Sequence, residues 1–546
     1  MTRSLYIDTL RTIAVLLVVF FHFNISLFSK GHYGVEIFIF ITGLLMGATM
    51  HANIVTYFRS RYFRIVPQLS AVVIVSSILA FFHVTPYPYN SSVSPIIALP
   101  IGLNFVFSNI VGYFGEEAKT VFTLHLWSIS VEIVFYMLAA IAIYTRYQYS
   151  FILLFSVLIF TLEFAILSDQ YYAISSRAIF FFLGLFLVRQ EPKYLMFGLL
   201  YEAWWVVTGP SVFSIDRILL LAALLLSYRA KTLTATWTPE KLKKVIQHIA
   251  SLSYEIFLVH WPLLVILCSL TGNTFLSTNE VLILLVFTYL AARALSYYKL
   301  SILQYHLHLL SLLIFLSVMS SVTAGFSFRL EKKYEQYSTQ LFHILQTPET
   351  DLSALPENEL SMAEFFIGDS HARMYFHIYP RSTAKRFYLD VPLDELFKTL
   401  EMEKISGQKI YVSYRWSGEK LEEVEAFVSK DRKLGLTDRL TVFTELPTTD
   451  ENLMECYLKS KWFLKQECVQ LRESDGTVDK KLFTSLNSPQ AKLINSSGFD
   501  KVWVESLLCG PDRCKVIIEG DLLYRDRTHL SEVKGALLFE GFRENG

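Results

Sequence analysis

The sequence predicts a polytopic α-helical membrane bundle in residues 1–326, with about eleven spans, followed by an α/β/α domain in residues 362–546. The chain of 546 residues is 53% hydrophobic, with 44 Phe and 30 Tyr, which is too apolar for an ordinary soluble protein. Up to residue 326, apolar stretches of about 15–23 residues recur between short polar joints, as helices that cross a ~30 Å hydrocarbon layer require. The composition then becomes that of a soluble domain, as in LEEVEAFVSKDRKLG.

Charge and composition further limit the partners and the segments that this protein can have. The formal net charge is zero, which gives no reason to expect a nucleic-acid partner. Residues 327–361 are too polar for another span and predict a partly helical linker. The first apolar run lacks the basic segment and small-residue cleavage site of a signal peptide, so we expect it to remain as the first helix.

Positive charges between the apolar stretches predict how many of them cross the bilayer, because cytoplasmic joints are enriched in Lys and Arg. The candidate stretches are roughly 10–28, 34–52, 67–83, 95–112, 127–145, 150–168, 176–189, 194–208, 214–229, 247–270, 281–298 and 304–325. With Arg3 inside, the joint FRSRYFR also falls inside. If residues 95–112 only dip into the outer face, the later basic joints fall inside as well, and the C-terminal domain lies outside the cytoplasm.

Cysteine placement bears on the same question. Cys268 lies in an apolar span, whereas four cysteines lie in the soluble part: Cys456, Cys468, Cys509 and Cys514. In an oxidising compartment these four can form two short-loop disulfides. The alternative is four free thiols in a cytosolic domain.

The first apolar stretch, YIDTLRTIAVLLVVFFH, contains ionisable residues that a plain spanning helix does not need. His22 follows Arg11 by eleven positions, so both side chains share one helical face, ~16 Å apart along the axis. Asp8 precedes Arg11 by three positions and can pair with it. Ionisable groups at membrane depth usually line a cavity or a proton relay. The plainer alternative is an Arg11 that snorkels to the interface and a His22 that hydrogen-bonds between helices.

Two later apolar stretches, LHLWSISVEIVFYM and SLSYEIFLVHWPLL, also contain polar groups. These groups are His125, Ser128, Glu132 and Tyr136 in the first stretch and Tyr254, Glu255 and His260 in the second. The first three share one helical face, because their spacing is i, i+3 and i+7. Three polar sets in one bundle indicate the lining of a reaction chamber or of a transport path.

These segments, together with GVEIFIFITGLLM and RYFRIVP, resemble the acyltransferase-3 family in order and spacing over about residues 5–300. The family's Arg-ten-residues-His signature matches Arg11 and His22. Its Trp-Ser-x-x-x-Glu signature matches Trp127, Ser128 and Glu132. The resemblance implies transfer of an acyl group, typically acetyl, from cytosolic acetyl-CoA to an extracytoplasmic carbohydrate. It also implies that His22 is catalytic, with Glu132 as its helper.

The same resemblance suggests where the donor binds. Arg61 and Arg64 lie three apart on one cytoplasmic face, and with Arg11 they are suited to the phosphates of CoA. Plain positive-inside topology explains these arginines equally well. One departure stands out: relatives of this architecture usually have Arg-x-x-Glu in the SRAIFFFLG region, whereas this chain keeps Arg177 and has Phe180 in place of the acid.

In the C-terminal domain, AEFFIGDSHARMYFHIY predicts a strand, a tight turn and a helix that begins at Ser370. A helix N-terminus favours an oxyanion. Downstream, LLYRDRTHLSEVKGALL supplies Asp526 and His529 just before another helix. Ser370, His529 and Asp526 can therefore act as nucleophile, general base and orienting group. His371 is expected to point away from this site.

This pattern resembles the SGNH hydrolase domain that is fused behind acyltransferase-3 membrane domains, over about residues 362–545. KIYVSYRWSGE and LTVFTELP resemble the later strands of that subgroup, and Cys509 with Cys514 fits its periplasmic members. The family's oxyanion-hole Gly and Asn are not identifiable from the motif alone. Gly418, Asn487 and Asn495 are the candidates.

The sequence therefore predicts an O-acyltransferase of the bacterial inner membrane, with its C-terminal domain in the periplasm. Acetyl-CoA is the expected donor, a cell-surface glycan such as lipopolysaccharide O-antigen the expected acceptor, and neither a bound metal nor a permanently bound cofactor is expected. Two other hypotheses stay open. One is a transporter or flippase fused to an esterase, and the other is a non-catalytic membrane sensor.

Overall fold

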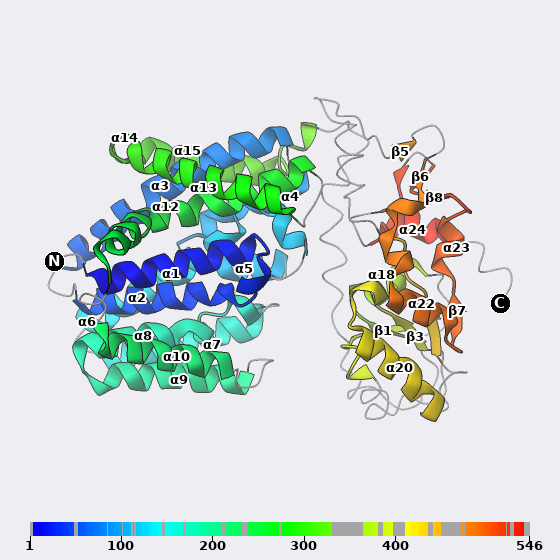
Figure 1. Cartoon of the computed structure of the whole chain (residues 1–546), viewed down its shortest axis with the longest axis horizontal. Coiled ribbons are helices and arrows are strands. Elements are labelled where there is room, and N and C mark those ends of the chain that lie inside the picture. Colours follow the sequence, from blue (N-terminus) through cyan, green and yellow to red (C-terminus); the bar gives the residue numbers. More distant parts are fainter. Residues whose placement is uncertain are drawn as a thin grey trace. The chain divides into compact units, whose positions relative to one another are not determined.

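A computed structural model places most of the chain. It describes residues 4–48, 53–83, 86–100, 102–110, 113, 116–144, 148–167, 170–208, 215–231, 238–271, 276–329, 364–379, 386–396, 410–434, 440–448, 471–472, 476–519, 521–524 and 529–539. The chain divides into two compact units, Met1–Phe326 and Ser327–Gly546 (Figure 1). Each unit has its own hydrophobic core.

The first unit is a bundle of helices. Its longer helices are α1 (Leu5–His22), α2 (Gly34–Ala48), α3 (Ile54–His83), α6 (Trp127–Tyr144), α7 (Gln148–Ile166), α8 (Ser175–Arg189), α9 (Pro192–Thr208), α10 (Ile215–Arg229), α12 (Glu240–Thr271), α13 (Thr278–Tyr297) and α15 (His306–Val322). Each of them overlaps one stretch that the sequence predicts to cross. Between them lie the short helices α4 (Pro86–Val93), α5 (Leu103–Ile110) and α14 (Lys299–Gln304).

Within the described residues, 6 helical segments are long and apolar enough to cross a membrane. They correspond to α1, α2, α3, α6, α12 and α13. The other five long helices have 15 to 19 residues. The number of crossings therefore stays a prediction. Over residues 94–110 the helix is interrupted, because a 3-10 turn (Ser94–Ala98) and the eight-residue α5 flank Gly102, which has a positive φ.

Close helix packing positions the centre of the bundle. Helix α1 packs against α2 and α12, and α2 packs against α8. At the α2–α8 contact, a Cβ on Gly43 would lie 2.1 Å from the Phe181 carbonyl oxygen, and one on Gly184 would lie 2.4 Å from that of Phe40. Small residues let membrane helices approach this closely. The outer helix α13 instead exposes Leu282, Val286, Phe287 and Leu290, which suits contact with lipid.

The second unit is built on a parallel sheet. Its strands are β1 (Glu364–Gly368), β2 (Arg386–Asp390), β3 (Ile410–Ser413), β4 (Leu440–Phe443) and β7 (Asp500–Val502), in the order β2-β1-β3-β4-β7. One face packs on α18 (Ser370–Ile378) and α24 (Glu532–Leu538). The other packs on α20 (Leu421–Leu434) and α22 (Pro489–Ser496). The result is a three-layer α/β/α arrangement.

The sequence of β1 explains this layering. All five residues of EFFIG are buried, as a central parallel strand with both faces covered requires. Phe366 belongs to the core on the α18 face, whereas Phe365 and Ile367 belong to the core on the opposite face. The strands are parallel, but the order in which successive strands join the sheet reverses at the boundary between β1 and β3. Ligands of such sheets bind in the crevice at that switch point.

A disulfide joins Cys509 to Cys514, one of the two close pairs that the sequence singles out. Cys456 and Cys468 lie outside the described residues. Cys268 is buried in α12 and is not part of a disulfide. The remaining small strands, β5 (Leu471–Arg472), β6 (Thr477–Asp479) and β8 (Arg513–Lys515), form a second sheet beside this disulfide, and β9 (Ile517–Ile518) pairs with β10 (Asp521–Leu522).

Replacing Cys509 by Ser is expected to destabilise the second unit by about 2 kcal/mol, because a crosslink across five positions removes that much loop entropy from the unfolded chain. Thermal unfolding of the full-length variant, read as the melting transition of this unit, measures the change. Cys268→Ser is the matched control. An unchanged transition in Cys509→Ser would contradict a structural role for this disulfide.

Candidate functional site

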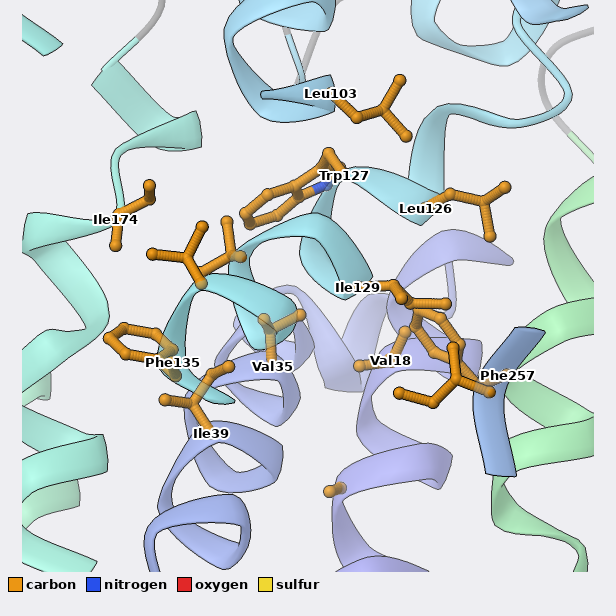
Figure 2. Close-up of a cluster of buried hydrophobic side chains, with 14 of the residues drawn as sticks. Val18, Val35, Ile39, Leu103, Leu126, Trp127, Ile129, Phe135, Ile174 and Phe257 are labelled. Carbon is orange, nitrogen blue, oxygen red and sulfur yellow. The ribbon is translucent and has the colours of Figure 1, made fainter. Parts of the chain in front are cut away.

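The first unit contains a cavity of about 510 Å³, within the range of small-molecule sites. Six helices line it: α1, α2, α3, α6, α12 and α14. Part of the lining is apolar and includes Val35, Ile39, Ile129 and Phe257, which belong to the buried hydrophobic cluster drawn in Figure 2. The remaining walls hold charged and polar groups, namely Asp8, Arg11, Arg64, Gln68, Glu132, Glu255 and Lys299.

Hydrogen bonds fix the carboxylates of this cavity. Glu132 accepts from the Thr42 hydroxyl at 2.9 Å and from the Tyr136 hydroxyl. Glu255 is buried and accepts from Gln68 at 2.9 Å, and Lys299 lies 3.7 Å from the same oxygen. Both carboxylates are therefore ordered before any ligand enters.

Arginine side chains of the cavity differ in their surroundings. Arg64 is exposed to the cavity and interacts electrostatically with Glu132 and Glu255. Arg11 also lines the cavity. Arg61, which the sequence groups with them, does not belong to the lining: it donates to the Tyr57 carbonyl and to Ser60, and its guanidinium lies 4.2 Å from the centre of the Tyr57 ring.

His22 occupies the last turn of α1 and forms a hydrogen-bonded chain with groups distant in sequence. Its Nδ1 lies 2.8 Å from Nε2 of His260, and its Nε2 lies 2.8 Å from the Tyr113 hydroxyl. The two imidazoles are stacked, and His22, Tyr113 and His260 are all buried. Among the described residues, Glu132 makes no hydrogen bond to His22: it lines the cavity and bonds to Thr42 and Tyr136 instead.

The contact of His260 with the Phe257 carbonyl decides which nitrogen donates in each of these hydrogen bonds. Nδ1 of His260 lies 2.7 Å from the Phe257 carbonyl, which can only accept, so this nitrogen carries the proton. Nε2 of His260 is then an acceptor, and Nδ1–H of His22 donates to it. This leaves the lone pair of His22 on Nε2, where the Tyr113 hydroxyl donates. His260 thus orients His22 as a base or nucleophile at Nε2.

Phe257 lies next to both the cavity and the histidines. Its side chain lines the cavity, and its ring centre lies 5.7 Å from that of His260 and 5.3 Å from that of His125. Phe38 packs against its other side, with ring centres 6.3 Å apart. Phe257 therefore borders both the charged cavity and the buried histidines.

The acid that the sequence lacks at Phe180 has a structural substitute. Arg177 lies 3.4 Å from a carboxylate oxygen of Glu36 on α2, and both side chains are almost fully buried. The guanidinium also lies over the rings of Trp127 and Tyr171. Tyr171 stacks on Tyr113, with ring centres 4.1 Å apart, so this ion pair supports the residue that holds His22.

The sequence did not identify four of these residues as part of the site. Glu36 is an acid inside an apolar stretch, which is a signal that could have identified it. Tyr113 lies in no recognisable motif, and Phe257 resembles any core residue. Lys299 appears in the sequence only as one of the basic joints. The positions of all four near the site depend on contacts between distant helices.

In the second unit, Gly368 ends β1 with φ of +145°, and a Cβ there would lie 1.9 Å from the Ser413 carbonyl oxygen. Only glycine fits this close approach of β1 to β3. Asp369 then caps α18 by accepting from the His371 amide at 2.8 Å, and its other oxygen accepts from the Arg415 amide. Ser370 therefore lies at the first position of α18, at the carboxyl edge of the sheet.

Ser370 and His529 meet as the sequence predicts, although 159 positions separate them: Nε2 of His529 lies 2.8 Å from the Ser370 hydroxyl oxygen. His529 is held where Leu530 packs in the core and pairs with Tyr524. Asp526 lies outside the described residues. Of the oxyanion candidates, Gly418 follows β3 near the same edge, whereas Asn495 lies in α22 and Asn487 just before it.

The prediction that His371 points away from this site is wrong. Its ring stacks on that of His529, with centres 4.6 Å apart and planes inclined by 26°. The reason is the cap: the oxygen of Asp369 that accepts from the His371 amide also lies 3.2 Å from Nδ1 of its ring, which turns the ring toward His529. Ser370 and both histidines therefore form one cluster.

Comparison with known proteins addresses the first unit. The acyltransferase-3 family model, described as an acyltransferase domain, matches residues 4–300. A Komagataeibacter xylinus protein named as a membrane-bound transacylase, BcsY, is 33% identical over 135 residues, which are 24% of this chain and 34% of that protein. The match thus spans about a third of the relative's length. No solved structure matches the chain. Because the family match covers more than half of the chain and includes every residue that lines the cavity, this protein belongs to the acyltransferase-3 family.

Proposed function

We propose that this protein transfers an acetyl group from cytosolic acetyl-CoA to a hydroxyl group of a carbohydrate on the far side of the bacterial inner membrane. Family membership supports acyl transfer in general. The observation that carries the finer proposal is the charged cavity whose lining residue Phe257 also packs against His260 of the His22–His260 pair.

In this proposal the cavity holds the donor. Arg11, Arg64 and Lys299 supply positive charge for the phosphates of CoA, and guanidinium groups bind phosphate through charge-assisted, bidentate bonds. The apolar wall suits the pantetheine arm, which carries no charge. The thioester would enter toward Phe257, whose displacement brings it to the imidazole.

The reacting atom is Nε2 of His22. It takes the proton of an acceptor hydroxyl, whose oxygen attacks the thioester carbonyl, and when the carbon–sulfur bond breaks the proton passes to the CoA thiolate. Alternatively, Nε2 attacks the carbonyl itself and carries the acetyl group to the acceptor. In both routes the hydrogen bond from Nδ1–H to His260 stabilises the charge on the ring.

Ser370 would complete the transfer. His529 takes the proton of the Ser370 hydroxyl as the serine oxygen attacks the acetyl carbonyl, and passes that proton to the group that leaves when its bond to the acetyl carbon breaks. A sugar hydroxyl then gives its proton to His529 and attacks the acetyl-serine, and His529 returns this proton to the serine oxygen as it leaves. The strand order, the turn at Gly368 and this Ser–His pair support an SGNH-type domain. We place this domain in the periplasm, in keeping with its disulfide.

The proposal is tested with full-length protein in liposomes that receive radiolabelled acetyl-CoA and purified O-antigen polysaccharide. We expect thiol release coupled to alkali-labile label on the glycan. In parallel, surface polysaccharide from cells that lack the protein should lose ester. A gain of ester on deletion would instead support an esterase fused to a transporter, and would overturn the proposal.

The positive charge in the cavity predicts which arginine binds acetyl-CoA. Replacing Arg64 by Gln is expected to raise the KM for acetyl-CoA about 10-fold or more, because a hydrogen bond to a charged group is worth ~1.5–3 kcal/mol. Arg61→Gln is the matched control and should change KM less than about threefold, since Arg61 contacts Tyr57 and Ser60 instead. Thiol release measured against acetyl-CoA concentration separates the two. Equal effects of both substitutions would place the phosphates outside the cavity.

A further inference from the structure

The stacked histidines of the second unit form an arrangement that the Ser370 reaction does not by itself require. His371 is 3% exposed, and Asp369 holds Nδ1 of its ring. A carboxylate only accepts, so Nδ1 is the donor. The ring face then lies against His529, the imidazole that contacts the Ser370 hydroxyl.

The charged groups around His371 come from four segments. Asp369 precedes α18, Arg415 follows β3, Glu445 follows β4, and His529 precedes α24. Burial lowers the pKa of His371, but the charges of Asp369 and Glu445 outweigh it and raise the pKa above its usual value. Burial raises the pKa of Asp369. The charge of His371 and the hydrogen bonds from His371 and from the Arg415 amide outweigh this and lower the pKa of Asp369 to about 2.

We propose that His371 is a positioning residue for the Ser370 site: held by Asp369, it carries positive charge against the face of His529 and keeps that ring neutral as pH falls. The inference rests on the proposed role of Ser370 as nucleophile. A charge stacked on a second imidazole disfavours protonation of that imidazole, so the two rings titrate as a coupled pair. His529 therefore stays a proton acceptor at lower pH than a lone histidine would.

The charge of His371 sets the pH at which Ser370 loses its reactivity. Protonated His529 cannot take the serine proton, so reactivity of Ser370 is lost as pH falls through the pKa of His529. Removing the positive charge of His371 raises that pKa, because the ring of His529 then gains its proton more easily. The reactivity of Ser370 should consequently disappear at higher pH in a variant that lacks the charge.

The test measures the rate at which a fluorophosphonate probe labels Ser370 in the full-length protein, between pH 5 and 9, with Ser370→Ala as the blank. We expect His371→Gln to move the midpoint of the acid limb upward by about one unit or more, as expected for unit charges ~5 Å apart in partly screened surroundings. Asp369→Asn, which retains a helix cap, should move it in the same direction. His377→Gln, on the same helix, is the control.

An unchanged midpoint in both variants would overturn the role of His371 while leaving Ser370 as a reactive nucleophile. Failure of the wild-type protein to label at any pH would overturn the nucleophile assignment, and the inference with it. Thermal unfolding of each variant identifies loss of structure. Asp369→Asn removes the carboxylate that favours the positive charge of His371, but it leaves the His371 ring in place. A shift of the midpoint in that variant therefore reports the charge of His371 and not the packing of its ring.

Discussion

Replacing Ser370 by Ala is expected to lower acetyl transfer to the glycan by at least about 10³-fold, because loss of a nucleophile removes the whole Ser–His reaction. The fold should be retained, since the hydroxyl contacts His529 at the edge of the sheet and Ala favours a helix. Alkali-labile acetyl on isolated polysaccharide, compared with wild-type cells at equal protein level, measures the loss.

Ser506→Ala provides the matched control, because Ser506 is exposed in the helix Val504–Leu508 and bonds only locally to Trp503 among the described residues. Its activity should stay within about twofold of wild type, since surface substitutions rarely alter structure. Ester on the glycan at wild-type levels in Ser370→Ala would mean that the membrane unit acylates the sugar directly. The second unit would then serve to bind the acceptor.

Replacing His22 by Ala is expected to reduce both thiol release from acetyl-CoA and ester formation by about 10²–10⁴-fold, the usual contribution of a positioned acid–base group. The loss follows from removal of Nε2, the lone pair that the His260 hydrogen bond orients toward Tyr113. Reconstituted protein with a thiol reagent measures the first quantity, and label on the glycan measures the second.

His308→Gln is the control for His22→Ala, because His308 lies exposed on α15. It should retain thiol release within about twofold. The two substitutions in the two units also distinguish the steps. If Ser370→Ala keeps thiol release while His22→Ala loses it, acyl discharge belongs to the first unit and delivery to the second. Thiol release unaffected in His22→Ala would contradict a catalytic role for this histidine.

Local patterns in the chain were sufficient to predict most of the architecture. Hydrophobic stretches located every long helix of the first unit, because the periodicity and length of an apolar helix are properties of consecutive residues. The turn at Gly368 was predictable for the same reason: Gly, Asp and Ser have distinct roles in a strand–turn–helix connection. The pairing of Ser370 with His529 was expected from their two motifs, and the structure brings the two side chains into contact, while their catalytic role stays a prediction.

The partners of His22 could not be predicted. Tyr113 and His260 lie 91 and 238 positions away from it, and no spacing rule relates residues on separate helices. The same holds for Arg177, whose acidic partner Glu36 comes from α2 and not from its own helix. The sequence grouped Arg61 with Arg64 by helical spacing, yet only Arg64 lines the cavity, since the local contacts of Arg61 with Tyr57 hold it elsewhere.

The amino-acid order thus established which segments are helices or strands and which residue types can do chemistry, because both depend on neighbours along the chain. Folding decided which of those residues meet. Packing of α1 on α12 brought His22 into contact with His260. The Asp369 cap turned the ring of His371 toward His529 rather than away from it. Such contacts arise from the mutual fit of whole elements, which no short stretch of sequence contains.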